Sequence, residues 1–191
     1  PHPPPATSPL RLLASVNQGL GMGLAPQLDW DGTGGTYVLR NAHRKKIAAF
    51  KPRDEEPFAP NNPKGLQGKI GQQGIHHSVP SGESHLREVV AYKLDSHSGA
   101  RAGFSSVPFT LLAEAMHPAF HVASHRPLSR YGAKVGSLQQ WVPEAEAAGD
   151  FGPSSFPPAE VHKIAILDMR TLNVDRNDGN ILVVREAAPP P

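Results

Sequence analysis

The 191-residue chain contains no cysteine. Disulfide bonds, thiolate metal sites and thiol-linked acyl anchors are therefore excluded, and an intracellular location is slightly favoured. No stretch approaches 18 consecutive apolar residues, so the sequence predicts no membrane-spanning helix. The 19 basic and 17 acidic residues leave a formal net charge of only +2 with no basic stripe, so a nucleic-acid partner is not expected.

The chain is also poor in apolar residues and rich in residues that interrupt regular structure. Hydrophobic residues make up 38% of it, and it contains 18 glycines and 21 prolines. This composition predicts long loops around a small ordered core. We expect residues 1–28 to be a disordered Pro- and Gly-rich tail, residues 29–186 to form the folded domain, and residues 187–191 to be a second tail.

The patterned segments predict an α+β fold. The expected strands are residues 37–39, 47–50, 137–142 and 181–184, and the expected helices lie within residues 83–95 and 157–173. In the first helix, Leu86, Val89, Val90 and Leu94 recur near helical spacing and predict the buried face. The order strand, strand, helix, strand, helix, loop, strand is typical of an α+β domain.

Leu172–Val184 reads LNVDRNDGNILVV and places acidic and amide side chains directly before an aliphatic strand. An EF-hand calcium loop is excluded, because Gly179 at its sixth position would put Arg185 where the final glutamate ligand belongs. A kinase catalytic loop needs an aspartate that orients the acceptor hydroxyl and an asparagine five residues later that holds magnesium. Asp175 and Asn180 have this spacing. A solvated turn remains the alternative.

Nucleotide phosphates are bound by a cation on a strand and by a glycine-rich turn whose amides face the phosphate oxygens. Asp31–Thr36 (DGTGGT) is such a turn, although it departs from the protein-kinase G-x-G-x-x-G pattern, and Lys51 ends the strand segment IAAFK. We expect an acidic side chain to hold this lysine. Glu88 is the first candidate, and Glu55 or Glu56 are alternatives nearer in the sequence.

Together these segments resemble the phosphatidylinositol 3- and 4-kinase family, and within it the plant-type gamma branch of the type II phosphatidylinositol 4-kinases. The matching stretches are FKPRDEEPFAPNNPKG (50–65), REVVAYKLD (87–95), VGSLQQWV (135–142) and FPPAEVHKIAILDMRTLNVDRNDGNILV (156–183). The resemblance covers residues 31–185. It implies a protein-kinase-like fold, of which this chain would hold the small nucleotide lobe and only the start of the large lobe.

The resemblance also implies roles for individual residues. Asp175 and Lys51 would be catalytic, with Lys51 on the α-phosphate, and Asn180 would be a magnesium ligand. The ATP-binding residues would be Gly32, Thr33, Gly34, Gly35 and Thr36 of the turn, Lys51 with Glu88, and the interlobe residues Gln140, Trp141 and Val142. The backbones of Gln140 and Val142 would bond to adenine, with Trp141 beside it.

Members of this family transfer the γ-phosphate of ATP to the 4-hydroxyl of phosphatidylinositol, and some of the plant-type branch phosphorylate proteins. The expected cofactors are therefore ATP and Mg²⁺, and the acceptor is phosphatidylinositol or a protein. The expected location is the cytoplasm. Animal members anchor to membranes through lipidated cysteines, which this chain lacks, so any membrane contact here would be peripheral or made by other parts of the protein.

One departure concerns the metal site. The family needs a second metal-binding aspartate beyond the catalytic loop, and none of the eleven residues after Asn180 is an aspartate. We therefore expect the chain as given to be inactive or incomplete, and a non-catalytic nucleotide-binding scaffold is the alternative. His76 and His77 are expected to be solvated rather than metal ligands, because adjacent loop histidines point apart. Asp168 is expected to bond locally.

Overall fold

The computed structural model describes residues 8–96, 103–123 and 132–185. Within these residues, an antiparallel sheet has the strand order β1-β2-β3-β5-β4. The strands are β1 (Gln27–Asp29), β2 (Thr36–Arg40), β3 (Lys46–Pro52), β4 (Thr110–Ala115) and β5 (Lys134–Gln140). The helices are α1 (Pro9–Gly21), α2 (Ser84–Ser96) and α3 (Pro158–Thr171), and a small second sheet pairs β6 (Glu146–Ala147) with β7 (Leu182–Val183). The predicted α+β class is confirmed.

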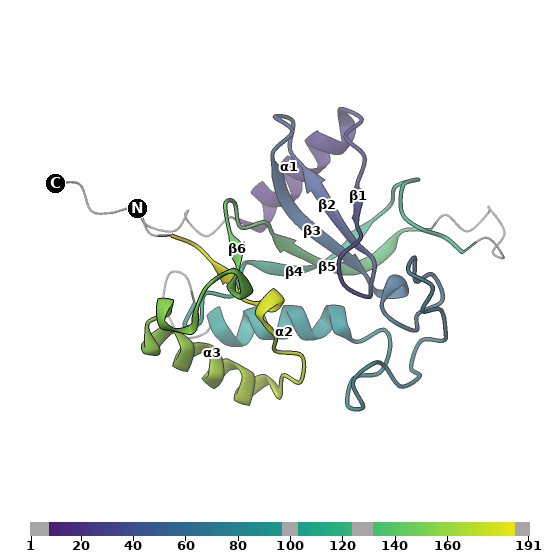
Figure 1. Ribbon diagram of the computed structural model, residues 1–191. Coiled ribbons are helices and arrows are strands. Elements are labelled where there is room, and N and C mark those ends of the chain that lie inside the picture. Colours follow the sequence, from purple (N-terminus) through teal and green to yellow (C-terminus); the bar gives the residue numbers. More distant parts are fainter. Residues whose placement is uncertain (1–7, 97–102, 124–131, 186–191) are drawn as a thin grey trace.

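The two faces of the main sheet have different partners, because successive side chains on a strand point to opposite faces. On β3, Phe50 belongs to a buried cluster shared with α1, whereas the next residue, Lys51, reaches Glu88 on α2. The members of the cluster are Leu12, Val16, Tyr37, Leu39, Ala48, Phe50, Phe120 and Leu138. In Figure 1, α1 lies against β2 and β3, α2 runs below β4 and β5, and α3 lies beyond α2. The main apolar cluster therefore lies on one face of the sheet, and Lys51 lies on the opposite face beside the buried Val38 and Ala49.

The prediction of a disordered tail over residues 1–28 is wrong for residues 9–21, which form α1, and for the strand β1. Pro9 occupies the first turn of α1, where its missing N–H costs nothing. Leu12 and Val16, four residues apart, are buried against the sheet. Gly19, part of the glycine pattern that suggested a linker, allows close packing, because a Cβ there would lie 1.9 Å from the Arg40 carbonyl oxygen.

Two further predictions about these elements need correction. In α2, Val89 is buried as predicted, but Leu86 and Val90 are 46% and 49% exposed. The buried positions of this helix also include His85, which bonds to Glu56, so polar contacts and not an apolar stripe fix its orientation. The strand predicted to reach residue 142 ends at Gln140, the last residue of β5.

The predicted tail over residues 187–191 lies outside the described residues, as do residues 1–7. Within the described part of the chain, none of the helices has both the length and the apolar character needed to cross a bilayer.

Candidate active site

Lys51 is held by a carboxylate that comes from the helix opposite it. Its Nζ lies 2.5 Å from Glu88 Oε1, and the second oxygen of Glu88 accepts a hydrogen bond from Ser137 Oγ at 2.6 Å. Three elements meet here, because Lys51 is on β3, Glu88 on α2 and Ser137 on β5, directly opposite Lys51 in the register. Of the three acidic candidates in the sequence, Glu88 is the one that pairs with this lysine.

The glycine-rich turn Asp31–Thr36 joins β1 to β2 and is fixed at both ends. The Gly35 N–H donates to the Glu55 carbonyl oxygen at 2.9 Å. Lys64 Nζ donates to the carbonyls of Asp31 and Gly32. Gly32 has a φ of +71°, a left-handed conformation that glycine adopts without strain. The turn is therefore anchored to the loop after β3.

Asn62 is the main anchor, and sequence reasoning did not single it out. Its side chain is fully buried and makes hydrogen bonds to five backbone groups. The amide nitrogen donates to the carbonyls of Thr33, Glu55 and Glu56, and the amide oxygen accepts from the N–H groups of Lys64 and Leu66. The only available signal was its place in the stretch FKPRDEEPFAPNNPKG, because no periodicity predicts a buried amide in a loop.

A buried ionic network lies beneath the same turn. Lys134 Nζ bonds to Glu55 Oε1 at 2.6 Å, to Asp54 Oδ2 at 2.9 Å and to the His121 carbonyl at 2.7 Å. The other oxygen of Glu55 accepts the hydroxyl proton of Tyr37 at 2.7 Å. A Cβ on Gly35 would come within 2.3 Å of this oxygen. Glycine at this position therefore lets the turn pack directly on the buried carboxylate.

Burial raises the pKa of Glu55, the carboxylate at the centre of this network. Desolvation raises the pKa of Glu55 from its ordinary 4.5 to about 6, against the attraction of Lys134, which lowers it. Burial likewise raises the pKa of the Tyr37 hydroxyl well above its ordinary range.

The raised pKa of Glu55 predicts a pH dependence of stability. Between pH 4.5 and about 6 the folded chain keeps a proton that the unfolded chain has lost, so the free energy of unfolding falls as pH rises through this window. The expected contribution is about 2 kcal/mol. Urea unfolding of the wild type and of Glu55→Gln at pH 4 and pH 7 checks it. The difference in free energy between the two chains should change by that amount, and a constant difference would contradict the assignment.

Arg176 holds together the segment predicted to be the catalytic loop. The helix α3 ends at Thr171, and Leu172 adopts a left-handed φ of +50° that turns the chain into the loop. Arg176 forms two hydrogen bonds to Asp168, at 2.8 and 2.7 Å, and a third to the Asn180 carbonyl oxygen at 2.7 Å. These bonds hold the pKa of Asp168 below its ordinary value, against burial. As expected from the sequence, Asp168 bonds locally.

Asp175 and Asn180 lie together in the loop that precedes the strand β7. Asn180 Nδ2 donates to the Asp175 carbonyl oxygen at 2.7 Å and lies 3.4 Å from the Asp175 Oδ2 atom. In the described part of the chain, no cluster of three or more histidine, aspartate or glutamate side chains could hold a metal ion. Mg²⁺ takes only one or two protein oxygens and fills its other positions with water and phosphate. The Asn180 amide oxygen therefore suits one position of such a site.

The backbone N–H groups of Gln140, Trp141 and Val142, the residues predicted to lie between the two lobes, differ in their hydrogen bonds. The N–H of Gln140 donates to the Phe109 carbonyl at 2.7 Å, and that of Trp141 donates to the Ile47 carbonyl at 2.9 Å. Within the described residues, the N–H of Val142 meets no acceptor. Lys46 Nζ lies 4.7 Å from the centre of the Trp141 ring.

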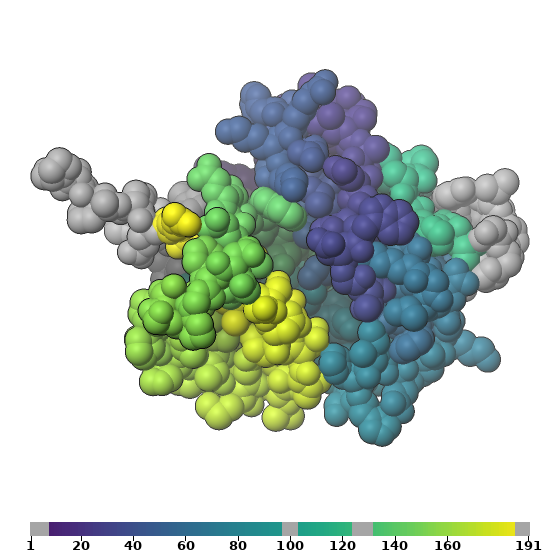
Figure 2. Space-filling model, viewed as in Figure 1, coloured from purple at the N-terminus to yellow at the C-terminus, as the bar shows by residue number. Residues whose placement is uncertain are grey.

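The two halves of the predicted site meet through α2. Lys51 and Glu88 form one pair and Asp175 with Asn180 another, and α2 contacts both β5 and α3. Figure 2 shows a hollow between the purple and blue N-terminal part and the green and yellow C-terminal part. One direct contact joins loops of these parts, because His76 Nε2 lies 3.2 Å from Asp175 Oδ1. The side chain of His76 is 38% exposed, in line with the expectation of a solvated histidine, but it also meets Asp175, which the sequence did not predict.

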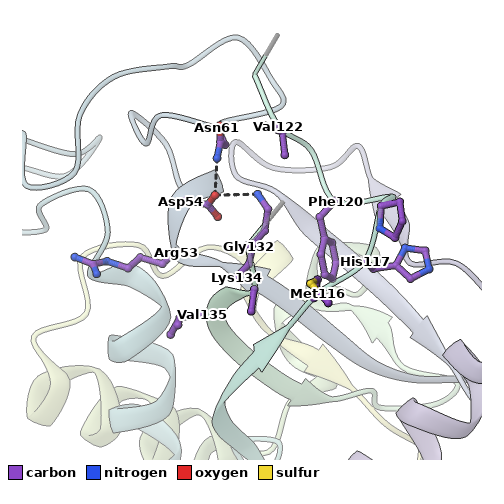
Figure 3. A pocket seen from close by; sticks show the side chains of 12 residues that line it. Arg53, Asp54, Asn61, Met116, His117, Phe120, Val122, Gly132, Lys134 and Val135 are labelled. Atoms are coloured by element: carbon purple, nitrogen blue, oxygen red, sulfur yellow. Dashed lines mark hydrogen bonds and ion pairs between the residues drawn. The ribbon is translucent and has the colours of Figure 1, made fainter. Parts of the chain in front are cut away.

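A cavity of about 800 Å³ lies elsewhere (Figure 3). Its walls include Asp54, Asn61 and Lys134, and Figure 3 shows Asp54 between the other two. Lys134 begins β5, whereas Gln140 ends that strand at the interlobe segment. The cavity is therefore at the opposite end of β5 from the residues predicted to bind adenine.

Comparison with known proteins identifies a family. The family model "Phosphatidylinositol 3- and 4-kinase" matches residues 32–188. Phosphatidylinositol 4-kinase gamma 1 of Arabidopsis thaliana is 45% identical over 175 residues, which are 91% of this chain and 30% of that protein. Phosphatidylinositol 4-kinase gamma 8 of Arabidopsis thaliana is 45% identical over 173 residues (90% and 31%), and gamma 4 of Oryza sativa subsp. japonica is 39% identical over 183 residues (93% and 31%). The chain thus spans about 30% of the length of these curated relatives, and the predicted resemblance is confirmed.

Proposed function

This chain belongs to the phosphatidylinositol 3- and 4-kinase family, and we propose that it binds ATP for transfer of the γ-phosphate to the 4-hydroxyl of phosphatidylinositol. By family it is a kinase-like transferase. The observation that carries the proposal is the Lys51–Glu88 ion pair at 2.5 Å, on the face of the sheet opposite the main apolar cluster. The relatives are named phosphatidylinositol 4-kinases, which supports the lipid acceptor.

Lys51 would bind the α-phosphate of ATP. Its partner Glu88 is held in turn by Ser137 at 2.6 Å, so the ammonium group is fixed in place before nucleotide arrives. The side chain of Lys51 is 33% exposed, so it is accessible to a ligand. The glycine turn would lie over the phosphates, and because Asn62 and Lys64 already hold it, little ordering is needed on binding.

Asp175 would orient the acceptor hydroxyl and accept its proton, which is the role of the aspartate in this kind of loop. Asn180 would provide an amide oxygen to Mg²⁺, which when bound neutralises charge on the phosphates. At the other end of the nucleotide, the Val142 N–H would donate to adenine, with Trp141 beside the base. The ionisable groups would thus act mainly through positioning and electrostatics.

The identity of the phosphate acceptor determines whether the reaction would take place at a membrane surface. Phosphatidylinositol lies in a membrane, so its phosphorylation would need peripheral contact with a bilayer from the cytoplasmic side. A protein acceptor is the alternative within the same fold. Parallel assays with phosphatidylinositol-containing vesicles and with a protein mixture distinguish the two acceptors.

Substitution of Lys51 by methionine tests nucleotide binding. ATP with Mg²⁺ is expected to raise the melting temperature of the unmodified chain, because a ligand that binds only the folded state stabilises it. Lys51→Met should lose most of this shift, since a charge contact to phosphate is removed. Lys45→Met, an exposed lysine in the turn before β3, is the matched control and should keep the shift.

Three outcomes separate the candidate functions. A thermal shift with ADP release supports the kinase proposal. A thermal shift without ADP release, with either acceptor, supports a nucleotide-binding scaffold instead. An identical shift in the wild type and in Lys51→Met would overturn the assigned phosphate site.

A further inference from the structure

We propose that His76 is a positioning residue that orients the Asp175 carboxylate from the opposite side of the interlobe hollow. This inference rests on the proposed function, because it assigns a partner to the catalytic aspartate. The two residues are 99 positions apart in the sequence, yet His76 Nε2 lies 3.2 Å from Asp175 Oδ1. In Figure 2, the blue-green residues of this loop lie against the yellow residues of the catalytic loop.

The backbone around His76 is a closed turn. The Val79 N–H donates to the His76 carbonyl at 3.0 Å, and the Gly74 N–H donates to the Val79 carbonyl at 3.1 Å. Arg87 Nη2 donates to the Ser78 carbonyl at 3.0 Å and ties the turn to α2. Since the next residue of α2 is Glu88, which pairs with Lys51, the same turn of helix fixes groups on both sides of the site.

The loop around Asp175 holds the main chain of that residue but leaves the carboxylate to His76. The Asp175 N–H donates to Asn173 Oδ1 at 3.0 Å, and its carbonyl accepts from Asn177 at 3.0 Å and Asn180 at 2.7 Å. The carboxylate is 62% exposed, and Oδ2 has only the 3.4 Å approach of Asn180. With Oδ1 bound to the imidazole, Oδ2 is presented to an acceptor hydroxyl.

The expected effect of losing this contact is on turnover rather than on nucleotide binding. Misplacement of a catalytic group by about 1 Å can cost on the order of 10²-fold in rate. In the full-length protein, we expect His76→Ala to lower kcat about 10-fold, with the KM for ATP within about twofold of wild type, since the Lys51 side of the site is unchanged. His76→Gln, whose side-chain amide can still donate to the carboxylate, should recover most of the loss.

His77→Ala is the matched control. His77 is the next residue, is exposed, and within the described residues makes no hydrogen bond with its side chain. It should have wild-type turnover, and both alanine variants should unfold at the same temperature. In an Asp175→Asn background, His76→Ala should cause no further loss, because its effect acts through the carboxylate.

A second measurement does not depend on turnover. In ¹⁵N NMR spectra of the full chain, Asp175→Asn should shift the ring-nitrogen signals of His76 and leave those of His77 in place. Unchanged His76 signals would overturn the inference, and so would normal kcat in His76→Ala together with lost turnover in Asp175→Asn. Normal turnover in Asp175→Asn would instead overturn the proposed function. A shift of the His76 signals would still support the contact itself.

Discussion

Asp175→Asn is expected to lower ATP-dependent phosphoryl transfer about 10²–10⁴-fold, the usual contribution of a positioned general base. The substitution keeps the shape of the side chain and removes the charge that would accept the hydroxyl proton. Because the main chain of Asp175 is held by three asparagine side chains, the loop should keep its conformation. The loss should therefore appear in the kcat of the full-length protein, measured as ADP release with saturating ATP, Mg²⁺ and phosphatidylinositol vesicles.

Asp178→Asn is the control for this prediction. It removes the other carboxylate of the same loop, which receives a hydrogen bond from the Gly179 N–H rather than from the segment opposite. Equal losses in the two variants would mean that the charge of the loop matters and not the aspartate at position 175. Unchanged turnover in Asp175→Asn would remove the catalytic assignment altogether.

Lys134→Met is expected to destabilise the chain by about 3–5 kcal/mol at pH 7, because it leaves a buried carboxylate without its counter-charge. Glu55 is fully buried, and above its pKa of about 6 it is ionised in the folded chain. A typical domain is stable by only about 5–15 kcal/mol, so this loss is a large fraction. Urea unfolding at pH 7 measures it.

Two further variants make the test specific. Lys163→Met removes an exposed lysine that pairs with Glu160 at 2.6 Å on α3, and such surface pairs contribute only about 0–1 kcal/mol. Adding Glu55→Gln to Lys134→Met should restore part of the lost stability, because the fully buried carboxylate that Lys134 paired with is then replaced by a neutral amide. If Lys134→Met costs no more than Lys163→Met, the network beneath the glycine turn is not held by its charge pair.

The sequence predicted elements whose signal is local. The strands around Tyr37 and Phe50 are short apolar runs, and Pro158 with Glu160 marks the start of α3. The spacing of Asp175 and Asn180 likewise needs only six consecutive residues, and the structure brings the two side chains together. The catalytic and metal-binding roles of these residues stay predictions.

Other features depend on contacts between distant segments and leave no local pattern. Glu88 could be distinguished from Glu55 only by the position of α2 on the sheet. The pairing of Glu55 with Lys134 joins residues 79 positions apart, and that of His76 with Asp175 joins residues 99 apart. The helix α1 does have a local pattern, the spacing of Leu12 and Val16. It was missed because the prolines and glycines around it suggested a linker.

The family match begins at residue 32, whereas α1 and β1 precede that position and belong to the folded unit. A recombinant fragment that begins at residue 32 would lack Leu12 and Val16, so Phe50 and Leu39 would lose their contacts with α1. It would also lack β1, so β2 would be an unpaired edge strand. Exposed apolar surface beside an unpaired edge strand promotes aggregation. Expression boundaries for this protein should therefore be drawn ahead of Pro9.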